Sequence, residues 1–143
     1  MSNPLYGQNK YDAVVGTKIN PGVPQAAIGG TGTLTIAMIL KQILEEDPAG
    51  AATWTLPTAA LAVAGVEGAE IGDCLDFWVI NTDATNDVAI TIAAGTGGTL
   101  VGNMEVESPE TTAEKISSGS GMFRLRFTGV ASGSEAYTVY RLA

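Results

Sequence analysis

After residue 50 the apolar runs of the sequence are short, and glycine, asparagine, aspartate or serine separates most of them from the next. Short runs with alternating side chains are typical of β-strands, whereas a helix needs a longer segment with apolar residues three and four positions apart. The alternation is clearest in residues 122–128, where apolar residues alternate with Arg124 and Arg126. This pattern predicts a half-buried strand. The chain is therefore predicted to be mainly β, as a β-sandwich or a jelly-roll-like module.

Strands are predicted over residues 52–56, 75–81, 88–93, 99–101, 104–107, 122–128 and 137–142. The sequence NTDATND at residues 81–87 is typical of a turn, because asparagine and aspartate accept left-handed backbone conformations and bond to nearby backbone. We therefore expect residues 75–81 and 88–93 to form a hairpin. Gly102 and Asn103 are expected to form a turn between the next two strands. Residues 58–63 suit a single helical turn or a loop.

One early helix is expected over residues 33–47, TLTIAMILKQILEED. Apolar residues partly follow a spacing of three and four, Thr33 can cap the N-terminus, and Pro48 and Gly50 end the segment. Two features argue against this helix. The acidic residues 45–47 lie at the negative end of the helix dipole, and residues 34–39 also fit a strand.

The length of 143 residues suits a single domain with one hydrophobic core. Residues 1–32 are rich in proline and glycine, so we assign them to an extended N-terminal arm and residues 33–143 to one β-sandwich domain. Lys10, Asp12 and Lys18 give the arm a net charge of +1, whereas the other five basic and fourteen acidic residues give the domain −9. Two interpretations of the arm stay open: disorder, which is common at termini, or docking of its apolar residues on a partner or neighbouring subunit.

The composition excludes several classes of function. The chain has no histidine, which removes imidazole as a base or metal ligand and with it a Ser/His/Asp or Cys/His site. The net charge of −8 argues against nucleic acid as a partner, and no apolar run reaches the ~20 residues of a membrane span. The single Cys74 is interpreted as a small buried residue within an apolar run. We expect no enzyme activity, no cofactor and no metal site.

Three polar patterns resemble functional sites but have simpler interpretations. Asp83, Thr85 and Asp87 have the oxygen spacing of a calcium loop, yet the glycine and final glutamate of an EF-hand are missing, so a solvated hairpin turn is preferred. The glycine-rich residues 95–99 lack the Lys-Ser/Thr ending of a phosphate loop and are assigned to a turn. For Glu105 and Glu107, a solvated strand edge is simpler than a catalytic carboxylate pair.

Arg124 and Arg126 are the exposed charges of most interest, because an otherwise acidic domain presents both of them on one strand. They are candidates for a subunit interface in which they pair with Glu105 and Glu107 of a neighbouring copy. Pairing with acids on adjacent strands of the same chain is the alternative, since such cross-strand pairs stabilise a sheet by ~0.2 to 1 kcal/mol.

Several segments follow one another in a distinctive order: LTIAMILKQIL, DPAGAATWTLPTAA, GAEIGDCLDFWVIN, ITIAAGTGGTLVGN, FRLRFTGV and YTVYRL. In composition and order they resemble small virion proteins of tailed bacteriophages, particularly head decoration (cement) proteins. The resemblance covers residues 33–142. It rests on no catalytic signature, and similar modules rich in glycine, threonine and alanine also occur in head fibres and tail proteins.

The resemblance implies a non-enzymatic protein that binds the outer surface of an expanded icosahedral capsid, commonly as a homotrimer at threefold positions. The implied partners are the major capsid protein and further copies of the chain, and the implied location is the outside of the virion. The arm would add contacts with the shell, and its candidate capsid-contact residues are Leu5, Tyr6, Lys10, Tyr11 and Lys18.

The alternative function is a carbohydrate- or host-surface-binding module of a phage fibre, in which Trp54, Trp78 or Tyr140 stacks on sugar rings. The environment of Trp78 discriminates between the two functions. Burial of Trp78 between sheets would favour decoration, whereas an exposed aromatic platform beside polar side chains would favour carbohydrate binding.

Overall fold

The computed structural model describes residues 25–26, 28–111 and 116–143. Sheet A consists of β1 (Gln25–Ala26), β3 (Ile43–Glu46), β5 (Cys74–Asn81), β11 (Ser120–Gly129), β12 (Ala136–Arg141) and β7 (Gly98–Val101), in this spatial order. Sheet B consists of β2 (Gly32–Thr33), β4 (Ala52–Thr55), β6 (Ile90–Ala93) and β8 (Glu105–Val106). A separate ribbon consists of β9 (Pro109–Thr111) and β10 (Ile116–Ser118), and the helices are α2 (Ile36–Ile39) and α3 (Ala59–Ala64).

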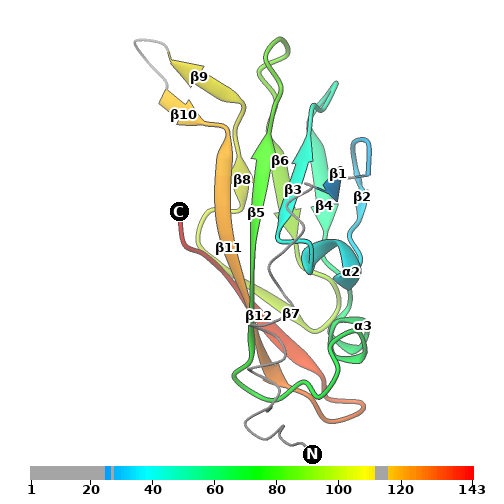
Figure 1. Ribbon diagram of the computed structural model, residues 1–143. Helices are drawn as coiled ribbons and strands as arrows, with labels where there is room; N and C mark the ends of the chain where they lie inside the picture. The colour runs from blue at the N-terminus through cyan, green and yellow to red at the C-terminus, as the bar shows by residue number, and fades with distance from the viewer. Residues whose placement is uncertain (1–24, 27, 112–115) are drawn as a thin grey trace, which may run out of the picture.

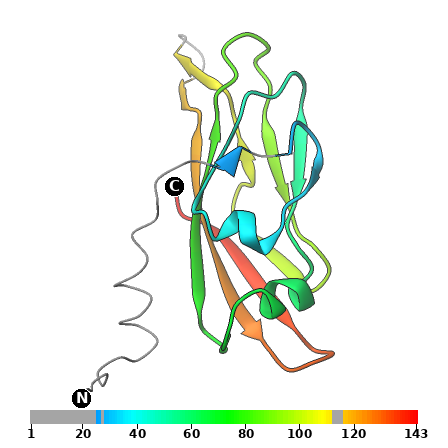
Figure 2. The same cartoon turned by 45° about the vertical axis from the view of Figure 1, so that its right-hand side comes forward.

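The two sheets form the layers of a sandwich, with the β9–β10 ribbon at one end and α3 near the other (Figure 1). Figure 2 shows the layers side by side, with β5, β11 and β12 in one of them. The hydrophobic core lies between the layers and includes Trp54 from sheet B and Phe77 and Phe123 from sheet A, all fully buried. The rings of Phe77 and Phe123 stack with their centroids 5.6 Å apart. The predicted mainly β fold is confirmed, and it is a β-sandwich.

From β1 to β8 the chain passes from one sheet to the other after every strand, so odd-numbered strands lie in sheet A and even-numbered strands in sheet B. Up to β6, successive strands of one sheet run in the same direction: β1, β3 and β5 are parallel, and so are β2, β4 and β6. The antiparallel pairs are β5–β11, β11–β12, β6–β8 and the ribbon. These parallel pairs distinguish the sandwich from a jelly roll, whose strands are antiparallel.

The predicted hairpins are wrong, although their strands are present. Residues 75–81 and 88–93 correspond to β5 and β6, which lie in opposite sheets; β6 pairs with β4 and β8. In the same way β7 pairs with β12, and β8 pairs with β6. The apolar faces of β5 and β6 meet across the core, where Phe77 and Ile90 are both fully buried. Alternation identifies the buried face of a strand but does not say whether the next strand lies beside it or opposite it.

The helix expected over residues 33–47 is also wrong, because only α2 is helical and its N-cap is Thr35. The backbone turns sharply at Gln42, whose φ is 71°, and continues as β3 between β1 and β5. Leu44 of β3 is fully buried in the core, a gain that a solvent-facing helical turn would not provide. Thr33 lies in β2. The helical turn expected at 58–63 is confirmed as α3, which Thr58 caps, and neither helix is long enough to cross a membrane.

The end of the segment that we assigned to the arm contributes to both sheets. Gln25 and Ala26 form β1 at the edge of sheet A, and Gly32 begins β2 at the edge of sheet B. The indole of the fully buried Trp54 donates a hydrogen bond of 3.0 Å to the carbonyl of Gly30. The chain before residue 33 is therefore attached to the core at Gly30.

Two buried polar side chains join the sheets at opposite ends. Asn81, at the end of β5, donates to the carbonyls of Val88 (2.7 Å) and Val106 (3.1 Å) on the sheet B side. Tyr137, on β12, donates to the carbonyl of Pro57 at 2.9 Å, and its hydroxyl accepts from the N–H of Gly95 at 3.1 Å. Burial raises the pKa of the Tyr137 hydroxyl, so it remains a donor at neutral pH.

The Tyr137 contacts can be tested by removing a single oxygen atom. Tyr137→Phe leaves the buried carbonyl of Pro57 and the N–H of Gly95 without this partner, so the free energy of unfolding is expected to fall by about 1–3 kcal/mol. Denaturant-induced unfolding measures this loss. Tyr140→Phe is the matched control, because Tyr140 is only partly buried, and it is expected to change the stability by less. Equal losses for the two variants would contradict the bridging role.

Candidate functional site

The face of sheet A that points away from sheet B carries an apolar row across four neighbouring segments. Ile43 on β3 pairs with Trp78 on β5, which pairs with Met122 on β11. Leu142, just after β12, donates its backbone N–H to the carbonyl of Met122 at 2.8 Å. Trp78 is 39% exposed and Leu142 is 47% exposed. We name Ile43, Trp78, Met122 and Leu142 the apolar row, and this side of sheet A the outer face.

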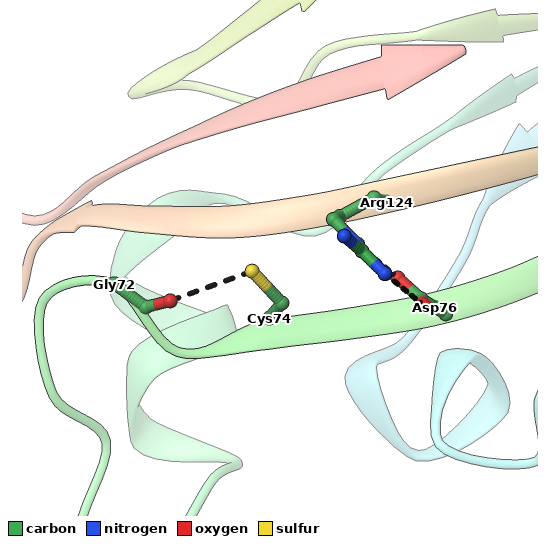
Figure 3. A network of polar contacts seen from close by, with 4 residues as sticks. All are labelled: Gly72, Cys74, Asp76 and Arg124. Atoms are coloured by element: carbon green, nitrogen blue, oxygen red, sulfur yellow. Dashed lines mark hydrogen bonds and ion pairs between the residues drawn. The ribbon is translucent and has the colours of Figure 1, made fainter. Parts of the chain in front are cut away.

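The next row along the strands is polar at its centre. In the strand register, Arg124 on β11 lies between Asp76 on β5 and Tyr140 on β12. Tyr140 in turn lies beside the exposed Val101 on β7. The Arg124 guanidinium donates through Nε and Nη2 to the two carboxylate oxygens of Asp76, each at 2.7 Å (Figure 3). The hydrogen bond from Arg124 lowers the pKa of Asp76, so both groups are charged at neutral pH. Such a bidentate pair fixes the position of the guanidinium over β5, in the row next to that of Trp78.

Cys74 lies on the outer face as well, which contradicts the prediction that it is buried. Cys74 on β5 lies opposite Arg126 on the neighbouring β11. Its side chain is exposed and donates its Sγ–H to the carbonyl of Gly72 at 3.4 Å (Figure 3). Cys74 is the first residue of β5 and shares its side of the strand with Asp76 and Trp78, whereas Phe77 points to the core. The apolar run around Cys74 suggested burial, but the alternation along β5 places the thiol outside.

The four residues proposed for a subunit interface do not lie together. Arg124 and Arg126 are exposed on the outer face of sheet A, whereas Glu105 is exposed on β8 of sheet B and Glu107 follows it, half-buried. Arg124 pairs with Asp76 of its own chain, which is the local alternative that we left open. The arginine that does reach β8 is Arg141, which donates to the carbonyl of Glu105 at 2.6 Å.

The five candidate contact residues of the arm, Leu5, Tyr6, Lys10, Tyr11 and Lys18, lie outside the described residues. The two other aromatic candidates occupy different environments. Trp54 is fully buried in the core, and Tyr140 is partly buried on the outer face, one row from Trp78. Of the tryptophans, only Trp78 can therefore contact a partner directly.

The suggested calcium-binding residues form a structural corner between β5 and β6. Asp83 is fully buried, contrary to the expected solvated turn, and accepts backbone N–H bonds from Thr85 (3.0 Å), Asn86 (2.9 Å) and Val88 (3.2 Å). These bonds, that of Thr85 first, lower the pKa of Asp83 to about 2 against the opposing effect of burial. Among the described residues, no three His, Cys, Asp or Glu side chains gather where they could hold a metal ion.

A shallow depression lies where α3 meets the turn after β6. Its lining includes Thr58, Ala59, Thr96, Gly97 and Glu135, and it is open to solvent. The turn predicted at residues 95–99 is present but shorter: it leads from β6 into β7, and Gly98 and Thr99 already belong to β7. Glu135 supplies the only carboxylate among the described residues that line the depression. The other lining residues contribute small side chains and backbone. The outer face of sheet A is therefore the better candidate for function.

The contacts of Asp83 predict an acid-dependent loss of stability. Because the folded-state pKa of about 2 lies below the ordinary value of about 3.9, the stabilisation is complete above pH about 4 and is lost as the pH falls towards 2. Asp83→Asn is therefore expected to lower the melting temperature at pH 7, with a smaller difference from the native chain near pH 2. Thermal unfolding at several pH values measures this trend. Asp47→Asn, at an exposed position, is the control. A pH-independent effect of Asp83→Asn on the melting temperature would argue against the stabilising role of the carboxylate bonds.

Comparison with known proteins identifies no relative of this chain. No family model matches the sequence, and neither the curated proteins nor the solved structures contain a match. The function is therefore argued from the outer face of sheet A and from the sequence.

Proposed function

We propose that this chain is a non-enzymatic head decoration protein of a tailed bacteriophage. In this proposal it binds the outer surface of an icosahedral capsid and stabilises the shell by bridging neighbouring capsid subunits. The proposal rests first on the sequence resemblance; the exposure of Trp78 does not itself favour decoration over glycan binding, but the apolar row in which Trp78 lies beside the Asp76–Arg124 pair supplies a surface for contact with another protein. The assignment of a phage head as the binding target rests on the sequence resemblance. The outer face supports a surface-binding role.

The composition of the outer face suits contact with another protein. Protein interfaces have an apolar centre in which tryptophan, tyrosine, methionine and arginine are enriched, surrounded by a polar rim. The outer face carries Trp78, Met122, Tyr140 and Arg124 in adjoining rows of three neighbouring strands. These side chains are held by sheet pairing and not by loops, so little side-chain ordering is required when a partner binds.

The proposed action needs no chemical step. A protein that binds the assembled shell and not its separated subunits stabilises the shell by mass action, by an amount that grows with the logarithm of its concentration relative to the dissociation constant. Contact with two capsid subunits at once adds avidity, because the second contact forms within the complex. A homotrimer would match the threefold positions of the shell, because a closed threefold oligomer presents the same contact to each of the three subunits around such a position.

The outer face can be tested by attachment to expanded heads that lack the decoration protein. Trp78→Thr keeps a residue that favours β-strands but removes the indole, so affinity for the heads is expected to fall by at least about tenfold. Co-sedimentation with the heads over a range of protein concentrations measures the affinity. The control is Leu61→Gln, which changes an exposed apolar residue on α3, outside the strands that carry the outer face. Equal attachment of Trp78→Thr and the native chain would remove the outer face from the proposal, and no attachment of the native chain would contradict decoration itself.

Carbohydrate binding is the second candidate, and the exposure of Trp78 favours it. An exposed indole beside a carboxylate and a guanidinium offers a stacking surface together with hydrogen-bond partners for hydroxyl groups. By the criterion set from the sequence, this environment supports a glycan-binding surface. Titration of the native chain with polysaccharide from the host cell surface, followed by tryptophan fluorescence, tests it. A saturable change that Trp78→Thr abolishes would support glycan binding; no change would exclude the polysaccharides tested.

A further inference from the structure

The described chain begins at the edge of the sheet that carries the apolar row. β1 is the outermost strand of sheet A and pairs with β3, through Gln25 with Leu44 and Ala26 with Glu45. Residues 1–24 therefore join the sandwich at this edge. Trp78, on β5, lies two strands in from β1, a distance of about 10 Å at the usual strand spacing. A segment of 24 residues reaches up to about 80 Å when extended, so residues 1–24 can cross the whole outer face.

The composition of residues 1–24 suits an apolar surface. The segment contains large apolar residues that segments without a binding surface usually lack, among them Leu5, Tyr6, Tyr11, Val14, Val15 and Ile19. Aromatic and aliphatic side chains spaced along the segment can cover the exposed parts of Trp78 and Leu142, so the match between the segment and the outer face is apolar.

A second copy of the chain would be the competing occupant of the outer face. Each copy carries a net charge of −8, so free copies repel each other at long range. The segment, in contrast, is covalently attached, which gives it an effective concentration of about millimolar, above that of free copies in ordinary solutions.

We infer that residues 1–24 lie across the outer face of sheet A of their own chain in the free protein and cover the apolar row. This inference is independent of the proposed capsid partner. If the outer face does dock on a shell, the segment must leave it, and Leu5, Tyr6 and Tyr11 then become available for contacts with the shell.

Cys74 provides a direct test in the full-length chain. It is the only cysteine, it is exposed, and it lies on the outer face, so a nitroxide attached to its Sγ reports on whatever covers that face. In an isotope-labelled chain, the nitroxide is expected to cause loss of the amide NMR signals of residues 5–19, and reduction of the nitroxide restores them. A control chain with Cys74→Ser and Thr91→Cys carries the label on β6 of sheet B, where it should leave these signals unchanged.

A mixed sample separates the two occupants. Isotope-labelled chain without nitroxide is combined with nitroxide-labelled chain without isotope, so any signal loss must come from another copy. The inference expects signal loss within one chain and none in the mixed sample. Loss in the mixed sample alone would place the segment on a second copy, and loss in neither sample would show an uncovered face; both results overturn the inference. No capsid is present, so the outcome does not depend on the proposed function.

Fluorescence gives an independent readout without a label. Trp54 is fully buried, so quenching by iodide reports mainly on the 39% exposed Trp78. Replacing Tyr6 and Tyr11 by serine is expected to increase the quenching of Trp78, because the covering segment is weakened. Asn3→Ser with Gln8→Ser is the matched control in the same segment, and it should leave the quenching unchanged. Identical quenching in all three chains would mean that the tyrosines do not shield Trp78.

Discussion

Hydrogen bonds of the Asn81 side-chain amide fix the place where the chain crosses from sheet A to sheet B. The arrangement of the strands depends on this crossing. Its two N–H bonds reach carbonyls before β6 and in β8, and its oxygen accepts the N–H of Asp83 at 3.1 Å. Asp83 then gathers the N–H groups of the corner. A corner built in this way directs the chain across the core and prevents a hairpin, so β6 lies beside β4 and completes the parallel set. Buried amides and carboxylates are costly unless fully bonded, and here several of their bonds are made to backbone.

The alternation of side chains predicted the strands and their buried faces but not their neighbours. Phe123, Leu125 and Phe127 are all fully buried, as their spacing indicated, and the strands expected at 52–56, 75–81 and 137–142 are present. Pairing was missed because a turn-like sequence such as NTDATND serves equally in a hairpin and in a corner between sheets. The distinction lies in Asp83, whose carboxylate is buried and bonded to backbone, and no local pattern marks an aspartate as buried.

The outer face could be predicted only in part for a similar reason. The sequence singled out Trp78 and Arg124 separately, but their adjacency depends on the pairing of β5 with β11, which are far apart in the chain. Asp76, Ile43 and Met122 were missed as members of the site. The alternation within β5 was enough to place Asp76 and Trp78 on one side, and the same rule applied to Cys74 would have shown that its thiol faces outward.

The strands at the edges of the two described sheets are short: β1, β2 and β8 have two residues each, and β7 has four. The long strands β5 and β11 lie in the middle of sheet A, where both of their edges are paired. A short edge leaves few unsatisfied backbone groups, so it is a poor template for a strand from another molecule. Many copies can then be crowded together without joining edge to edge into fibrils, and association is left to side chains.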